Sequence, residues 1–173
     1  MKKKLTVEIA EGLGNQIFMY AFAYSLSKKF GYNLYIDNKS GYYKKKNLLR
    51  NHQKYMLDYF NLEGNIATDK MIYNTSFKRL KKKLKLALDY FNFKKNFLIE
   101  KNNKTFNNKI ADTFINIDKN KISNNLYIQG NFENYKYFQD FKSELRKIFV
   151  PKIDTINTNN SLINKIKNVN SIS

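Results

Sequence analysis

The sequence predicts an α/β protein in which helices pack on a parallel sheet, and three features near the N-terminus indicate this class. A strand-like stretch at residues 4–9 leads through a glycine turn into a long apolar segment, residues 17–26, without an intervening proline. Gly31 stands where the C-cap of that helix is expected, and a second strand follows at residues 32–36. The order strand, helix, strand implies two parallel strands joined by a right-handed crossover.

The glycine turn between the first strand and helix is the first candidate binding element. Such a turn directs free backbone N–H groups and the positive end of the helix dipole toward a ligand, most often a phosphate. We expect Gly12 to adopt a positive φ and Gly14 to leave space beside the backbone. Asn15 either caps the helix or reaches a ligand oxygen, and a capped turn without a ligand would give the same pattern. Ile17 replaces the third glycine of a dinucleotide fingerprint, and no Gly-Lys-Ser/Thr follows.

The remaining chain continues the α/β pattern with weaker signals. Residues 38–54 are polar and are expected to form a loop, and residues 55–60 fit either a strand or a helix. The later expected elements are a helical region at 68–91, an edge strand or loop at 97–99, a strand at 125–129, a helix at 138–149 that Pro151 ends, a short helix at 161–167 and the start of a strand at 169–173. We expect residues 1–173 to form a single Rossmann-like domain.

Composition limits the classes of partner. The net charge of +18 comes almost entirely from lysine, in a chain rich in Asn, Ile, Phe and Tyr, which favours AT-rich coding bias and a solvated surface over nucleic-acid binding. We therefore do not expect a nucleic-acid partner.

Cysteine is absent, which excludes disulfides and thiolate metal sites. No secretory signal or long apolar run occurs, so the sequence predicts a cytoplasmic protein.

One basic segment has helical order. Between residues 77 and 91 the apolar residues Leu80, Leu84 and Leu88 recur at helical spacing, and lysines occupy much of the remaining surface. Such a basic amphipathic helix fits peripheral contact with an anionic membrane at its inner face. A helix packed on its own domain gives the same pattern, and this interpretation is preferred.

Two segments resemble the family 11 glycosyltransferases, the α-1,2-fucosyltransferases of bacteria and animals. Residues 12–23, Gly-Leu-Gly-Asn-Gln-Ile-Phe-Met-Tyr-Ala-Phe-Ala, are similar to the N-terminal signature of that family. Residues 128–138 are similar to its strand, Gly-Tyr-Phe-Gln turn and following helix, with Asn131 and Glu133 in place of Tyr and Gln. The order and spacing of the two blocks also fit.

The resemblance implies an inverting transferase of the GT-B type, with two Rossmann-like domains facing each other across a cleft. It implies GDP-L-fucose as donor and the 2-hydroxyl of a galactoside as acceptor, typically on a lipopolysaccharide O-antigen or another surface glycan, with no metal or further cofactor. This chain would be the acceptor-side domain. Gly12, Gly14, Asn15 and Gln16 would then face the donor from the glycine turn.

The sequence lacks the His-x-Arg-Arg-x-Asp motif with which this family holds the donor phosphates. No two arginines are adjacent, and the single histidine, His52, is followed by Gln53. Residues 169–173 resemble the stretch before that motif. We therefore expect residues 168–173 to begin the donor domain, the rest of that domain to be absent, and this chain to have little activity alone.

The catalytic residues stay unassigned. His52 lies in a polar loop and is interpreted as a surface residue, and Asp37, at the end of a strand, as a loop cap. A non-catalytic nucleotide- or glycan-binding module and a basic protein that binds membrane or nucleic acid remain the alternatives. Without the second domain, the cleft-facing surface of this domain would be exposed to solvent. We therefore expect the isolated chain to be marginally stable or to self-associate.

Overall fold

A computed structural model describes residues 2–43, 54–100 and 116–152, and it contains a five-stranded, all-parallel sheet. The strand order is β3-β2-β1-β5-β4. The strands are β1 (Lys4–Glu8), β2 (Asn33–Asp37), β3 (Asn65–Ile66), β4 (Lys95–Ile99) and β5 (Ile122–Gln129). The predicted α/β class with a Rossmann-like parallel sheet is therefore confirmed.

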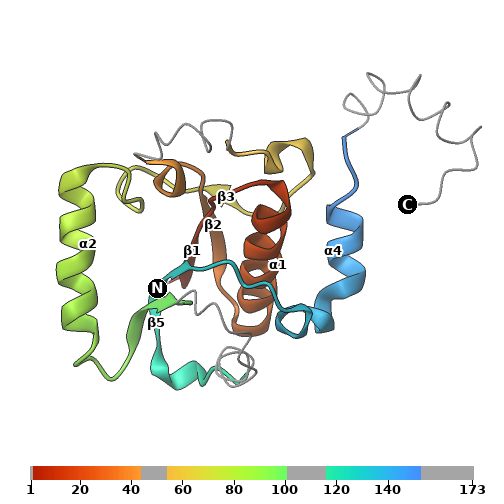
Figure 1. The fold of residues 1–173 in the computed structure, drawn as a ribbon. Coiled ribbons are helices and arrows are strands. Elements are labelled where there is room, and N and C mark those ends of the chain that lie inside the picture. Colours follow the sequence, from red (N-terminus) through yellow and green to blue (C-terminus); the bar gives the residue numbers. More distant parts are fainter. Residues whose placement is uncertain (1, 44–53, 101–115, 153–173) are drawn as a thin grey trace, which may run out of the picture.

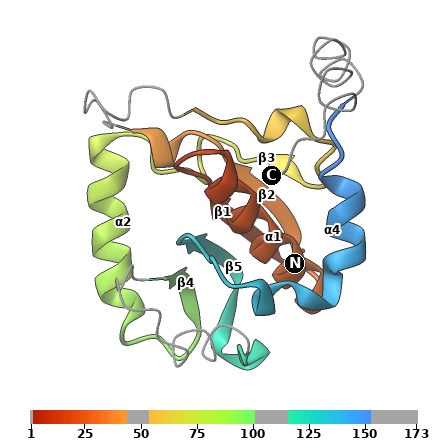
Figure 2. The same ribbon diagram turned by 45° about the vertical axis from the view of Figure 1, so that its right-hand side comes forward.

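Helices lie on both sides of this sheet. α1 (Leu13–Phe30) and α4 (Lys142–Ile148) are on one side, and α2 (Ser76–Asp89) is on the other (Figures 1 and 2). The apolar core lies between the sheet and α1, where Leu5, Val7 and Ile9 are fully buried. Phe22 of α1 stacks on Phe132 with 4.1 Å between ring centroids, which extends the core toward the segment after β5.

The opposite face of the sheet carries polar side chains beside a small group of aromatic rings. Successive side chains of a strand point to opposite faces, so Thr6 and Glu8 lie on the face away from Leu5 and Val7. The register places Glu8 beside Asp37 of β2 and Thr6 beside Tyr127 of β5. Because parallel sheets are usually apolar on both faces, this polar layer determines how the next helix can pack.

α2 packs with its polar side toward the sheet and its apolar side toward solvent. The predicted basic amphipathic helix is present, but Leu84 is 61% exposed while Lys82 is only 8% exposed. The other large residues of the exposed face are Phe77, Leu80, Leu88 and Phe91. The preferred interpretation of a helix packed on its own domain is therefore confirmed, but the packed face is the one that carries Lys82 and not the one that carries the leucines. The reason is that the sheet beneath α2 offers carboxylates and amides, which pair with lysine.

The glycine turn differs in detail from the expectation. Gly12 is the N-cap of α1 in an extended conformation with φ −79°, whereas Glu11 has φ 62°. Glu11, and not Gly12, therefore makes the sharp change of direction. No side chain caps α1, so Asn15 lies in its first turn and does not adopt the first of its two possible roles, that of a cap. Gly31 ends α1 in the left-handed region with φ 70°, which confirms the predicted C-cap.

The weaker sequence signals resolve into short elements. Residues 55–60 contain a 3-10 turn at Leu57–Tyr59, and residues 97–99 belong to β4, an edge strand. The helix expected at 138–149 is shorter: two 3-10 turns, Tyr135–Tyr137 and Gln139–Phe141, precede α4, and Pro151 follows it. His52 and the elements expected at 161–167 and 169–173 lie outside the described residues.

Buried tyrosines predict cooperative alkaline unfolding. Burial raises the pKa of Tyr20 and Tyr127, and burial together with the charge of Asp58 raises the pKa of Tyr55 to about 12. An unfolded tyrosine titrates near pH ~10, so the stability from these groups is complete below that pH and is lost as pH rises through the folded values. We expect circular dichroism and tyrosinate absorbance to change together above pH ~10. Full ionisation of these tyrosines in a protein that stays folded would contradict this.

Candidate functional site

The two segments that resemble the transferase family meet at the carboxyl end of the sheet. β1 and β5 are hydrogen-bonded neighbours with Val7 opposite Ile128, so the chain leaves both strands at the same edge. A cavity of about 400 Å³ lies there, and Glu11, Gly130 and Asn131 are among the residues that line it. Ligands of open parallel sheets bind at this edge. Residues more than a hundred positions apart thus form one candidate site.

The cavity lining is rich in hydrogen-bond acceptors. Three carboxylates contribute, from Glu8, Glu11 and Glu100, together with the side chains of Gln129 and Asn131. Charged carboxylates accept strong hydrogen bonds from hydroxyl groups and repel a phosphate placed beside them. The cavity therefore suits a polyhydroxylated ligand such as a sugar better than it suits the phosphates of a nucleotide.

One arginine balances part of this negative charge. Arg79 of α2 lines the cavity, and its Nη2 donates a hydrogen bond to the carbonyl oxygen of Ser40. Its guanidinium carbon lies 4.8 Å from the centroid of the Tyr43 ring, a cation–π distance. These contacts hold Arg79 at the wall of the cavity that α2 forms.

A buried network supports the floor of the cavity. Lys82 Nζ donates to Glu8 Oε2 at 2.9 Å and to Gln129 Oε1 at 2.7 Å. The Tyr127 hydroxyl lies 2.8 Å from the same Glu8 oxygen and 2.7 Å from Asp37 Oδ2. Burial lowers the pKa of Lys82, and the charges of Glu8 and Asp37 oppose that effect. The network joins β1, β2, β5 and α2 below the site.

Asp37 has the structural role that the sequence favoured. Its Oδ1 accepts hydrogen bonds from the backbone N–H groups of Lys39, at 3.1 Å, and Ser40, at 2.9 Å. The interpretation of Asp37 as a loop cap is therefore confirmed. Its second oxygen contacts Tyr127, so the same side chain also anchors the buried network.

The two glycines of the turn border open space. A Cβ atom added at Gly12 or at Gly14 would meet no atom within 4 Å, and neither residue has a positive φ. The described fold therefore does not itself require glycine at either position. Asn15 is partly exposed in the first turn of α1. A group approaching this helix start would meet backbone N–H groups before any bulky side chain.

Gln16 belongs to the interior and not to the open side of the turn. It is fully buried, and its Nε2 donates to the carbonyl oxygens of Glu11 and Lys54 at 2.9 and 2.8 Å. Its Oε1 accepts from the Met56 N–H at 2.9 Å. Gln16 therefore does not face the donor as the resemblance implied. It has a positioning role, because it holds Glu11 next to the segment that begins at Lys54.

Sequence reasoning did not assign Glu8, Glu11 or Glu100 to the site. Glu8 is the last residue of β1, and Glu100 directly follows β4. A carboxylate at the end of a strand was the available signal, because ends of parallel strands share one edge of the sheet. Glu11 had no such signal, since its positive φ is visible only in the structure.

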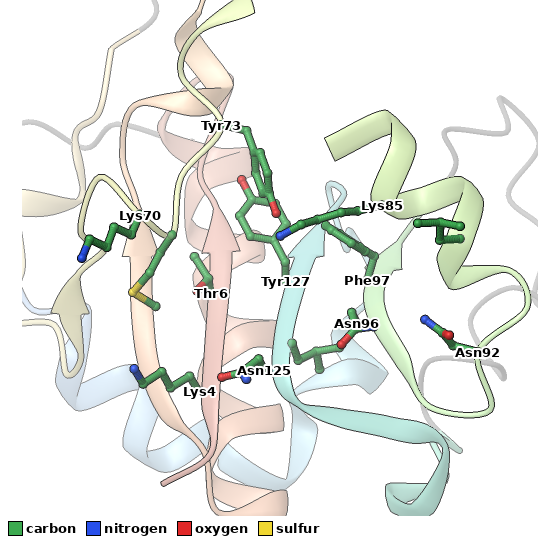
Figure 3. A pocket seen from close by; sticks show the side chains of 13 residues that line it. Lys4, Thr6, Lys70, Tyr73, Lys85, Asn92, Asn96, Phe97, Asn125 and Tyr127 are labelled. Carbon is green, nitrogen blue, oxygen red and sulfur yellow. The ribbon is translucent and has the colours of Figure 1, made fainter. Parts of the chain in front are cut away.

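A second cavity, of about 510 Å³, lies on the polar face of the sheet beneath α2 (Figure 3). Lys4, Lys70 and Lys85 line it, together with the rings of Tyr73 and Tyr127, and none of its lining residues is acidic. Figure 3 shows Lys85 extending from α2 over the sheet toward Tyr127. This basic cavity is lined by neither glycine of the turn and by none of the three glutamates of the first site.

Within the described ranges, no group of three or more His, Cys, Asp or Glu side chains is placed to hold a metal ion. None of the helices in these ranges is long and apolar enough to cross a membrane.

Comparison of the chain with protein-family models, with curated proteins and with solved structures found no match. Functional inference therefore depends on the site geometry and on the two sequence blocks that meet there.

Proposed function

We propose that this chain is the acceptor-side domain of a GT-B type α-1,2-fucosyltransferase, which transfers L-fucose from GDP-fucose to the 2-hydroxyl of a galactoside in a surface glycan. One observation carries the proposal. A single acceptor-rich cavity at the carboxyl end of the parallel sheet is lined by both segments that resemble the transferase family, through Met19 of 12–23 and through Gln129, Gly130 and Asn131 of 128–138. Its lining does not include Gly12, Gly14, Asn15 or Gln16, which lie at the adjoining start of α1.

The cavity is assigned to the galactoside because its carboxylates and amides match sugar hydroxyl groups. Glu11 is the proposed general base, since it lines the cavity and holds a positive φ, a conformation that often marks functional residues. The bond from fucose C1 to the acceptor oxygen forms while the bond from C1 to the GDP phosphate breaks. The hydroxyl proton passes to Glu11, and the electron pair of the breaking bond leaves with GDP.

The start of α1 is assigned to the donor. The backbone N–H groups of Gly14 and Asn15, with the positive end of the α1 dipole, would stabilise the charge that develops on the leaving pyrophosphate. This role needs no metal ion. We further propose a cytoplasmic protein that works at the inner face of the membrane.

A non-catalytic glycan-binding module is the second candidate. It is favoured by the hydrogen-bond acceptors of the cavity, which match sugar hydroxyl groups whether or not a donor binds beside them. The two candidates share the sugar in the cavity and differ at the helix start, because only the transferase domain should also contact GDP-fucose there.

Amide chemical shifts of the isotope-labelled chain can test both ligands. A β-galactoside is expected to shift the amides of Glu11, Gly130 and Asn131, and GDP-fucose those of Gly14 and Asn15. Galactoside shifts alone would support the binding module. The absence of shifts at this edge of the sheet with either ligand would refute both candidates.

Two variants sharpen this experiment. Glu11→Asn keeps a residue that tolerates positive φ but removes the carboxylate, and should weaken galactoside binding with little loss of stability. Gly14→Ala meets no steric obstacle, so stability should be unchanged or up to about 1 kcal/mol greater, whereas GDP-fucose binding should fall about tenfold. Glu144→Gln removes an exposed charge on α4 and is the matched control. Equal affinities in all three variants would contradict the assignment.

A further inference from the structure

We propose that the exposed apolar face of α2 docks on an anionic membrane surface. This face, the α2 stripe, consists of Phe77, Leu80, Leu84, Leu88 and the following Phe91. Each of these side chains is more than half exposed, and Phe91 is 84% exposed. A run of large apolar residues along one helix face is unusual for a surface that meets only water.

The orientation of the stripe is fixed by contacts on the opposite side of α2. Lys82 is paired with Glu8 and Gln129 of the sheet, and Arg79 bonds the Ser40 carbonyl oxygen. Rotating α2 to bury the stripe would break these bonds and would place leucines on the polar face of the sheet. The domain therefore presents the stripe outward as a consequence of its own internal bonding.

Charge identifies the occupant as an anionic surface. The exposed residues Lys81, Lys83 and Lys85 flank the stripe, and the only acidic residue of α2, Asp89, is buried. The Asp89 carboxylate accepts hydrogen bonds from the backbone N–H groups of Asn96 and Phe97, so it faces β4 and not the exposed side of α2. Lysines beside an apolar stripe are the arrangement of helices that lie in the headgroup region of a bilayer.

The basic cavity continues this positive charge beyond the helix. Lys85 and Leu88 belong to α2 and also line the cavity, where Lys4 and Lys70 add two further ammonium groups (Figure 3). An anionic headgroup could therefore lie beside the stripe while leucine and phenylalanine side chains reach the acyl region. A net charge of +18 adds long-range attraction to the same surface.

Aromatic residues mark the C-terminal end of this surface. Tyr90 is 80% exposed and Phe93 is 75% exposed, directly after α2. Amphipathic and aromatic rings are stable at the boundary between headgroups and acyl chains. The helix itself, at about 1.5 Å per residue, is about 21 Å long, which allows the whole stripe to lie flat on a membrane.

Co-sedimentation with lipid vesicles tests this proposal. The chain is expected to bind phosphatidylcholine vesicles containing phosphatidylglycerol at least tenfold more tightly than pure phosphatidylcholine vesicles, with affinity falling as salt increases. The double variant Leu80→Ser, Leu84→Ser should lose at least tenfold in partitioning without a change of charge. The variant Lys81→Gln, Lys85→Gln should lose about fivefold per lysine, and only on the anionic vesicles.

Matched controls distinguish vesicle binding by the α2 stripe from non-specific hydrophobic binding. Ile66→Ser, Val150→Ser removes two exposed apolar residues away from α2 and should leave binding unchanged. Circular dichroism of each variant shows whether it is folded. Three results would each overturn the proposal. They are vesicle binding that does not depend on anionic lipid, an equal loss of binding in the control variant, and an α2-dependent dimer in sedimentation equilibrium without vesicle binding. The result does not depend on the proposed transferase activity.

Discussion

Replacing Lys82 with methionine is expected to lower the free energy of unfolding by about 3–5 kcal/mol. The methionine keeps the apolar stem but removes the ammonium group that bonds Glu8 and Gln129. Glu8, which is only 7% exposed, would then be left in a buried site without its ammonium partner, and the Tyr127 hydroxyl would still bond it. Removing one partner of a buried pair costs more than the pair itself contributes, because the other charge stays desolvated.

Urea unfolding of three variants measures this effect. Lys81→Met changes the neighbouring exposed lysine and should alter stability by less than about 0.5 kcal/mol. The double variant Lys82→Met, Glu8→Gln should recover part of the loss, because no uncompensated carboxylate remains beside the new side chain. Equal destabilisation by Lys81→Met and Lys82→Met would show that the buried pair does not hold α2 on the sheet.

Gly41→Ala should destabilise the protein by about 3 kcal/mol. A Cβ atom at this position would lie 2.2 Å from the Ile9 carbonyl oxygen and 2.6 Å from the Ala10 Cβ. These atoms belong to the two residues that directly follow β1, so relief of the clash must move backbone at the candidate site. Ligand binding in the cavity should weaken together with stability, since Gly41 also lines it.

Gly12→Ala is the matched control for this prediction. An added Cβ there meets no atom within 4 Å, and the φ of −79° suits any residue. Its unfolding midpoint in urea should stay close to that of the parent chain. If Gly41→Ala were equally harmless, the close approach of residues 40–42 to β1 would not exist in solution.

The sequence was sufficient for β1, β2 and β5, but not for β3, for the strand order or for the direction in which α2 faces. Alternation of polar and apolar residues in Lys4–Glu8 and Asn33–Asp37 indicates strands with one polar face, a pattern that is uncommon in parallel sheets. The spacing of leucines in α2 predicts an apolar stripe. It does not specify what the stripe contacts, because that depends on the polarity of a sheet face assembled from three separate segments.

Prediction of the site had a similar limit. The glycine turn and the segment after β5 could be selected by their residue types, and the register of β1 with β5 places them at one edge. Gln16 was misassigned as a ligand contact because its hydrogen-bond partners Lys54 and Met56 lie about forty residues away. An exposed amide and a buried one look the same in a sequence until the chain around them is folded.

The polar layer beneath α2 divides the fold into two halves that respond differently to their surroundings. The α1 side is stabilised by exclusion of water from apolar side chains. The α2 side combines charge-assisted bonds centred on Lys82 with ring contacts among Tyr73, Phe97 and Tyr127. α2 can therefore separate from the sheet without exposing the apolar core. Its amide hydrogens should exchange with solvent earlier than those of α1, so that the wall of the candidate site that carries Arg79 is also the part of the domain that opens most easily.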